Sequence, residues 1–152
     1  MKLSSVLLAV SDLEQSKRFY QELFDQRIEL DLGWNVTFTG GFTIQLNYDL
    51  LTGIPKDKII KRSNNMELYF EVDGFDTFIE KLNTYSGIVY VNEPMECEWK
   101  QRVVRIYDPD FHIIEVGESM DIVAKRYLSL GCSIEETSAI IQHPIDFVKA
   151  CL

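Results

Sequence analysis

The sequence has no excess of basic residues and no long apolar segment, and each absence excludes a class of partner. It holds 15 Lys and Arg against 24 Asp and Glu, which gives a net charge of −9. Nucleic acids and anionic membranes need a basic face, so neither is expected to bind. No apolar run approaches the ~18 residues that span a bilayer. We therefore expect neither nucleic acid nor membrane among the partners.

Cysteine and histidine are also too few to suggest a familiar catalytic or metal motif. Cys97, Cys132 and Cys151 are odd in number and lack metal-type spacing, which is typical of free thiols in a reducing cytoplasm. His112 and His143 have no Ser, Cys or Asp at a recognised motif spacing, so the sequence does not support a hydrolase triad. No glycine-rich phosphate loop is present. The sequence predicts a cytoplasmic protein.

What the chain does contain is a repeated order of strands and helices. Residues 5–10 form an apolar run that predicts a buried strand, and an amphipathic helical pattern follows it. Alternating apolar residues then predict three further strands, at 28–32, 34–38 and 42–46. Ser11 and Glu14 have the spacing of a capping box at the start of the helix. The first part of the chain therefore predicts a β-α-β-β-β module.

The same plan restarts at residue 66. A shift of sixty-two positions lays Val6, Leu8 and Val10 on Leu68, Phe70 and Val72. A helix follows, then strands near 87–91 and 102–107. Asp108-Pro109-Asp110 predicts a tight reversal into a last strand that carries Glu115. The chain is thus a duplicated module.

The segments outside the repeat are a linker and a tail. Residues 53–65 hold four basic residues and are expected to form a solvated loop. Residues 119–152 predict three helices, at Asp121–Leu130, Ser133–Gln142 and Pro144–Leu152, with a capping box at Ser133 and Glu136. We therefore predict an α+β fold: modules 1–52 and 66–118 form a cupped, open barrel of mixed sheet, and a helical extension follows.

Strand alternation places four residues opposite the face that each helix covers. These are Ser5 and Gln45 in the first module, and Glu67 and Glu115 in the second. An acid in this kind of position is more often simply exposed. If the two sheets curl about a pseudo-twofold axis, however, all four side chains converge in one cleft.

In these features the chain resembles the glyoxalase, bleomycin-resistance and extradiol-dioxygenase superfamily, also called the vicinal oxygen chelate fold. The resemblance covers residues 3–118 and rests on LLAVSDLEQSKRFYQELF, ELYFEVDGFDTFIEKL and WKQRVVRIYDPDFHIIEVGE. It implies metal ligands at Ser5, Gln45, Glu67 and Glu115. Two departures stand out: Ser5 and Glu67 occupy positions where the family usually has His, and Phe111 stands where its turn usually has Gly.

The resemblance leaves the cofactor open. Hard oxygen donors at these four positions suit Mg²⁺ or Mn²⁺ better than Zn²⁺ or Ni²⁺. Alternatively no metal binds, and Glu67 pairs with Arg102 or Arg105 because a buried carboxylate needs a counter-charge. Catalytic roles, if any, fall on Glu115 and Glu67.

A small-molecule cleft also needs apolar and polar walls. The residues expected to line it and bind the ligand are Tyr69, Glu71, Trp99, Arg105 and Tyr107. Trp34 is placed either in this cleft or in the core.

Two functions follow from this interpretation. The first is a binder of the bleomycin-resistance type, which holds a small molecule between the modules without a catalytic metal. The alternative is a metal-dependent lyase or isomerase of the glyoxalase type, in which Glu67 or Glu115 moves a proton next to a carbonyl. A dioxygenase is less favoured because the two-His, one-carboxylate iron site is absent. Open sheet edges need covering, so a homodimer is expected.

Overall fold

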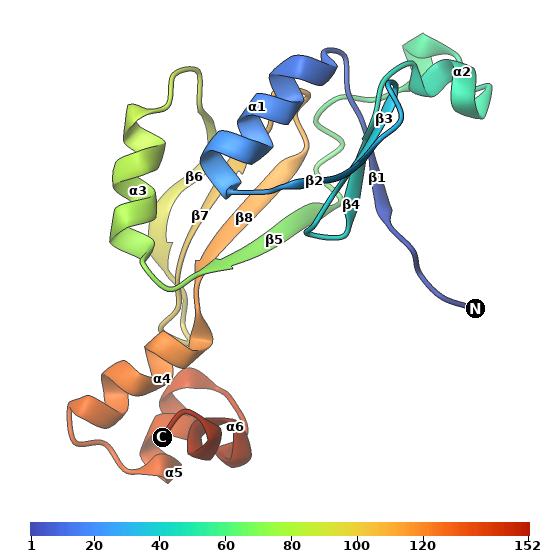
Figure 1. The fold of residues 1–152 in the computed structure, drawn as a ribbon. Helices are drawn as coiled ribbons and strands as arrows, with labels where there is room; N and C mark the ends of the chain where they lie inside the picture. The colour runs from blue at the N-terminus through green and yellow to red at the C-terminus, as the bar shows by residue number, and fades with distance from the viewer. The chain divides into compact units, whose positions relative to one another are not determined.

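The computed structural model describes residues 1–152 as two compact units (Figure 1). Unit 1 comprises Met1–Glu67, Tyr85–Val89 and Tyr107–Ile113. Unit 2 comprises Leu68–Thr84, Tyr90–Ile106 and Ile114–Leu152. The turn between the last two strands of the second module thus belongs to unit 1. The domain boundaries drawn from the sequence stay a prediction.

The sheet of unit 1 is mixed and four-stranded. Its strands are β1 (Val6–Ala9), β2 (Ile28–Asp31), β3 (Asn35–Phe38) and β4 (Phe42–Gln45). They lie in the order β1-β4-β3-β2, with β1 parallel to β4 and the other neighbours antiparallel. Because β1 and β4 are parallel, their carboxyl ends leave the sheet at the same edge.

Helix α1 (Leu13–Phe24) supplies five of the eleven buried apolar side chains of unit 1. The face predicted from helical spacing is the buried one: Leu13, Ser16, Phe19, Tyr20, Leu23 and Phe24. The Tyr20 ring packs on those of Phe38 and Phe42, at centroid distances of 5.6 and 4.8 Å. Aromatic packing of this kind adds to the stabilisation that comes from burial alone. The apolar side chains of α1 and of β3–β4 therefore form one core.

The start of α1 differs from the prediction. Asp12, not Ser11, is the N-cap, and its side chain accepts a hydrogen bond from the Gln15 backbone N–H. The predicted capping box is wrong because the Ser11 hydroxyl and backbone N–H both donate to Asp110, at 2.6 and 3.0 Å. The spacing of Ser11 and Glu14 could not indicate Asp110, which lies almost one hundred residues away in the sequence.

The second module has the predicted order of elements. They are β5 (Glu67–Val72), α3 (Phe75–Thr84), β6 (Val89–Glu96), β7 (Arg102–Tyr107) and β8 (Ile113–Glu118). The strand order is β5-β8-β7-β6, so this sheet is open as well. The structure confirms an α+β fold of two βαβββ modules. Strand β6 starts two residues later and ends five residues later than predicted; it is an edge strand, where Pro94 and polar residues are tolerated.

A buried network holds the turn between β7 and β8. Both carboxylate oxygens of Asp108 are used: Oδ1 accepts from the backbone N–H groups of Asp110 and His112, and Oδ2 accepts from the Tyr20 hydroxyl at 2.8 Å. The His112 ring Nδ1 also lies 2.8 Å from Oδ2. Burial lowers the pKa of His112, but the hydrogen bond and charge of Asp108 outweigh it and raise the pKa overall. These hydrogen bonds fix the turn against α1.

The linker 53–65 is mostly exposed, as predicted, but it is tied to unit 1. Unpredicted short helices lie just before it and within it: α2 (Tyr48–Thr52) and the 3-10 helix η1 (Lys56–Lys58). The Lys61 ammonium lies 3.2 Å from Asp110, and the Arg62 guanidinium stacks on the ring of Phe111. The linker is therefore anchored at its basic residues.

The extension forms three helices, as predicted: α4 (Met120–Ser129), α5 (Ile134–Ile141) and α6 (Ile145–Ala150). The capping box at Ser133 and Glu136 is confirmed. Apolar residues of all three helices share a cluster, and Trp99 packs against it. None of the helices has the length and hydrophobicity needed to cross a membrane.

Candidate functional site

The polar face of the sheet in unit 1 carries Ser5 and Gln45, and both are engaged within the protein. The hydroxyl oxygens of Ser5 and Thr43 lie 2.7 Å apart. Gln45 is buried; its Oε1 accepts from the Asn35 amide at 2.8 Å, and its Nε2 donates to the Leu46 carbonyl at 2.6 Å. Both polar ends of the Gln45 amide are therefore satisfied.

In unit 2, Glu115 lies on β8 and is only 6% exposed. Its carboxylate forms an ion pair with the Arg105 guanidinium on β7. The Arg105 side chain is about a quarter exposed, whereas that of Glu115 is nearly covered. A buried carboxylate is stable only when it is paired, and Arg105 supplies the counter-charge that Glu115 needs. The Arg105 guanidinium is thus the more exposed member of the pair, and the Glu115 carboxylate is the covered one.

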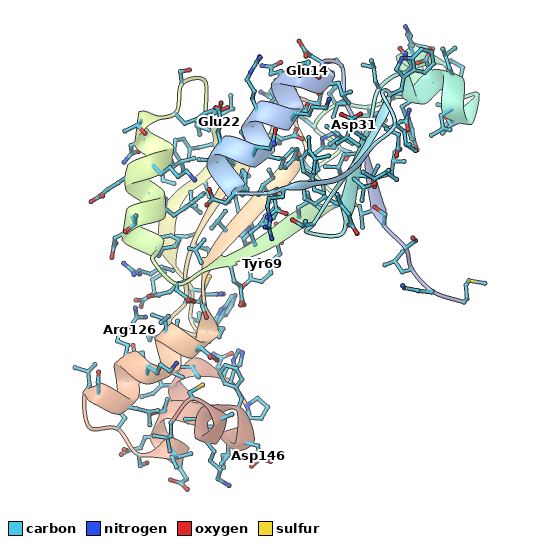
Figure 2. The ribbon with its side chains drawn as sticks, viewed as in Figure 1. Glu14, Glu22, Asp31, Tyr69, Arg126 and Asp146 are labelled. Atoms are coloured by element: carbon cyan, nitrogen blue, oxygen red, sulfur yellow. The ribbon has the colours of Figure 1, made fainter.

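A hydrogen-bond chain lies next to this pair. The buried Gln101 amide donates to the Tyr69 hydroxyl at 2.7 Å and to the Glu118 backbone carbonyl at 2.8 Å, and it accepts from the Trp99 indole at 2.9 Å. The Tyr69 hydroxyl donates to Glu71 at 2.9 Å. Tyr69 lies on β5, where Figure 2 labels it. The chain therefore fixes the position of the phenol.

The electrostatics of Tyr69 connect it to the ion pair. Burial raises the pKa of Tyr69 to about 12, and the nearby carboxylates of Glu71 and Glu115 add to the shift. Its hydroxyl stays protonated at neutral pH and serves as a hydrogen-bond donor. Burial likewise raises the pKa of the nearby Cys97 thiol, so Cys97 is a weak nucleophile. We name the group of Tyr69, Gln101, Arg105 and Glu115 the unit 2 polar face.

Gly117 makes room for this face, and its substitution is a direct test. A Cβ at Gly117 would lie 2.7 Å from the Gln101 amide nitrogen and 2.9 Å from the Tyr69 hydroxyl. We expect Gly117→Ala to separate these two groups and to lower the apparent pKa of Tyr69. Exposing its hydroxyl to water removes the largest cause of the raised pKa, and this outweighs the loss of the Gln101 hydrogen bond, which acts in the opposite direction. The measurement is an ultraviolet titration of tyrosine ionisation. Gly74→Ala is the control: Gly74 is in the same unit and has no positive φ, and an added Cβ there makes only ordinary contacts with Thr77, at 3.6 Å and beyond. An unchanged titration in Gly117→Ala would contradict the expectation.

The residues predicted to form one site are only partly brought together. Tyr69, Arg105 and Glu115 belong to the unit 2 polar face, and Glu71 of the same unit accepts a hydrogen bond from Tyr69. Gln101, which the sequence analysis did not single out, is central to it. An isolated glutamine carries no sequence signal, so only its burial and its three hydrogen bonds reveal its role.

The other predicted residues have different surroundings. Tyr107 belongs to unit 1, where its hydroxyl donates to Asn64 at 2.7 Å and Arg62 covers its ring. The Trp99 ring packs against the helical cluster. Trp34 is 58% exposed, so its placement in the core is wrong. Glu67 falls in unit 1, and its meeting with Glu115 in one cavity stays a prediction.

Arg102 has other partners than the sequence suggested, whereas a pair between Glu67 and Arg105 stays a prediction. Arg102 does not pair with Glu67; its guanidinium binds Glu118 and Asp76. Glu118 is almost fully buried and also accepts two hydrogen bonds from Arg126 of α4, labelled in Figure 2. Arg126 donates as well to the Lys100 carbonyl at 2.8 Å. These contacts attach the extension to the sheet of unit 2.

Comparison with known proteins supplies the family. The model of a glyoxalase-like domain matches residues 3–121. The chain belongs to the glyoxalase-like domain family. A comparison with curated proteins found no match. The resemblance drawn from the sequence is thereby confirmed.

Solved structures agree with this family. A protein of unknown function from Agrobacterium tumefaciens str. C58 is 33% identical, with a TM-score of 0.68 over 78% of this chain and 94% of that one. A glyoxalase/bleomycin resistance protein/dioxygenase family enzyme from Burkholderia phytofirmans PsJN is 16% identical, with a TM-score of 0.67 over 78% and 98%. A fosfomycin resistance protein, FosX, from Mesorhizobium loti is 24% identical, with a TM-score of 0.58 over 78% and 92%. The last two show likeness of fold alone.

Within each unit, side chains at the positions where the family resemblance implies metal ligands already have partners in the protein. Oε1 of Gln45 is occupied by Asn35, the Ser5 hydroxyl by Thr43, and the Glu115 carboxylate by Arg105. No three His, Cys, Asp or Glu side chains cluster closely enough to hold a metal ion. A divalent cation at Glu115 would have to displace a guanidinium that already neutralises the carboxylate. We therefore derive no reaction step through a metal.

Proposed function

We propose that this glyoxalase-like protein is a small-molecule binder that uses the unit 2 polar face and needs no metal. The observation that supports it is the Arg105–Glu115 pair: it stands at a strand position where the family resemblance implies a metal ligand, and it carries its own cation. A guanidinium binds carboxylate or carbonyl oxygens of a ligand, and the covered carboxylate of Glu115 keeps that guanidinium in place.

The neighbouring groups support the same role. Tyr69 supplies a hydroxyl that stays protonated, and Gln101 holds it at a fixed position. The ligand we propose therefore has an oxygen acceptor that faces Arg105 and a second polar group within reach of Tyr69. That it lies between the two modules, and that the protein is a homodimer, stay predictions; sedimentation tests the second.

The test is a fragment screen by NMR with isotope-labelled protein, followed by two matched variants. We expect fragments that carry a carbonyl or carboxylate to shift the amide signals of Arg105, Glu115 and Gly117. Glu115→Gln keeps the size of the side chain but removes the charge that holds Arg105, so it should weaken these fragments about tenfold while the fold persists. Glu93→Gln, an exposed change on strand β6 of the same sheet, should weaken them less than about threefold.

Two outcomes would overturn the proposal. One is a screen in which no fragment shifts these signals. The other is a Glu115→Gln variant that binds the fragments as tightly as the original protein. Titration with Mn²⁺ distinguishes this binder from the alternative, a metal-dependent lyase or isomerase. Selective broadening of the Glu115 and Gly117 signals at stoichiometric metal would favour the alternative.

A further inference from the structure

A cavity of about 290 Å³ lies wholly within unit 1, away from the residues discussed so far as a site. It opens where the parallel strands β1 and β4 end, and the backbone N–H of Val10 there donates to the Gln45 carbonyl at 2.9 Å. Lys56, Ile59 and Lys61 of the linker also line it. Three chain segments far apart in sequence, together with Asp110, therefore build one enclosure.

The walls combine an apolar surface with polar groups that make no hydrogen bonds inside the protein. Val10, Leu46 and Ile59 supply the apolar part. The side-chain amide of Asn47 and the hydroxyl of Tyr48 line the cavity too, and neither has a partner in the protein. Asn47 adopts a left-handed backbone conformation, with φ of 53°. Small-molecule sites typically have this mixture of apolar surface and a few convergent polar groups.

The charged groups that a ligand reaches first in this cavity are ammonium groups. Two lysines and two aspartates line it, and each lysine is paired with one aspartate: the Lys56 ammonium lies 3.8 Å from Asp49 and that of Lys61 3.2 Å from Asp110. The side chains of Lys56 and Lys61 are 76% and 55% exposed, whereas those of Asp49 and Asp110 are only 17% and 4% exposed. Both Asp110 oxygens already accept hydrogen bonds from Ser11. Lys61 has three N–H donors and Asp110 takes one of them. The lining carries no net charge as a whole, but the ammonium groups are its accessible part.

Strained backbone next to the cavity holds the linker in place. Phe111 has φ of 69°, a left-handed conformation that a bulky residue rarely adopts and that explains why the family usually has Gly here. Its ring packs under the guanidinium of Arg62 at 4.3 Å and lies 5.9 Å from the Lys61 ammonium. A glycine at 111 would avoid the strain but would offer no ring to these cations. The strained backbone of Phe111 therefore places the ring that Arg62 and Lys61 of the linker contact.

We propose that this cavity is a second ligand site, which binds a small organic carboxylate. The carboxylate lies between the ammonium groups of Lys56 and Lys61, and the apolar body of the ligand packs on Val10, Leu46 and Ile59. Asn47 and Tyr48 hydrogen-bond a further polar substituent. The site uses residues of unit 1 alone. The experiment that tests it is therefore independent of the test of the unit 2 polar face.

The test is an NMR titration of the full chain with three probes of one shape: benzoate, neutral benzamide and cationic benzylamine. Benzoate is expected to shift the amide signals of Asn47, Ile59 and Lys61 saturably at millimolar concentration, and the other two are not. Lys61→Gln and Lys56→Gln should each weaken benzoate about tenfold, the effect of losing one charge-assisted hydrogen bond. Lys58→Gln is the matched control, because Lys58 is an exposed lysine of the same helix η1 region but does not line the cavity.

The results that would overturn the proposal are equally specific. Benzamide or benzylamine that binds as tightly as benzoate would show that the lysines do not select the ligand. An equal loss in Lys58→Gln would indicate attraction to the whole basic linker rather than a site. Lys61 also contacts Asp110, so Lys61→Gln alone can disturb the linker; an undiminished affinity in Lys56→Gln, whose side chain is mostly solvated, would by itself count against the proposal.

Discussion

Replacing Asp108 with alanine is expected to lower the free energy of unfolding by about 4 kcal/mol. The carboxylate is buried and accepts from two backbone N–H groups, the Tyr20 hydroxyl and the His112 ring. Removing it leaves several buried donors without a partner, at about 1–3 kcal/mol each before relaxation. Urea unfolding followed by circular dichroism measures the change.

Two further variants show how much of this loss of stability comes from each hydrogen bond of Asp108. Asp108→Asn keeps an oxygen for the backbone N–H groups and should lose about half as much stability, since a buried neutral acceptor is weaker than a charged one. Tyr20→Phe removes a single hydrogen bond and should cost about 1–2 kcal/mol. If Asp108→Ala costs no more than Tyr20→Phe, the carboxylate does not hold the turn in the way described.

The second large effect is expected at Glu118, where alanine should cost about 3 kcal/mol. Its carboxylate accepts from Arg102 at 3.0 and 3.2 Å and from Arg126 at 2.9 and 3.0 Å. Removing one member of a buried ion cluster leaves like charges facing one another and costs about 3–5 kcal/mol. Both guanidiniums are about a third exposed and can be hydrated, which places the expected cost at the low end.

A surface pair on the same sheet is the control. Glu96 and Lys100 are 3.4 Å apart and both well exposed, so Glu96→Ala should change stability by no more than about 0.5 kcal/mol. Chemical denaturation of both variants under the same conditions gives the comparison. A similar small change in Glu118→Ala would mean that the extension is attached by its apolar cluster alone.

Most of the fold could be predicted from the sequence because its signals are local. The buried face of α1 follows from helical spacing, and β7 and the capping box of α5 lie where the pattern placed them. The edge strand β6 runs further than predicted because exposed polar residues weaken the alternation there. Helix α2 was missed, since five residues are too few for a helical period to be visible.

The candidate site was only partly predictable. The burial of Glu115 was inferred correctly from the repeat and the family resemblance, against the usual exposure of an acid on a strand. The partners of the charged side chains could not be predicted: Arg102 binds Glu118, and Asp110 binds Ser11. Such partners depend on which strands become neighbours and how their residues align. A one-dimensional pattern does not contain that information, and Gln101 was missed for the same reason.

The position of Trp99 has a consequence for relatives whose structures are unknown. Its ring lies in the glyoxalase-like domain yet packs into the apolar cluster of helices α4–α6. A relative that ends with the domain would expose a large aromatic ring at this place, and a polar residue would suit it better. The residue at the position of Trp99 thus serves as a marker, readable from sequence, of whether a family member carries a packed helical extension.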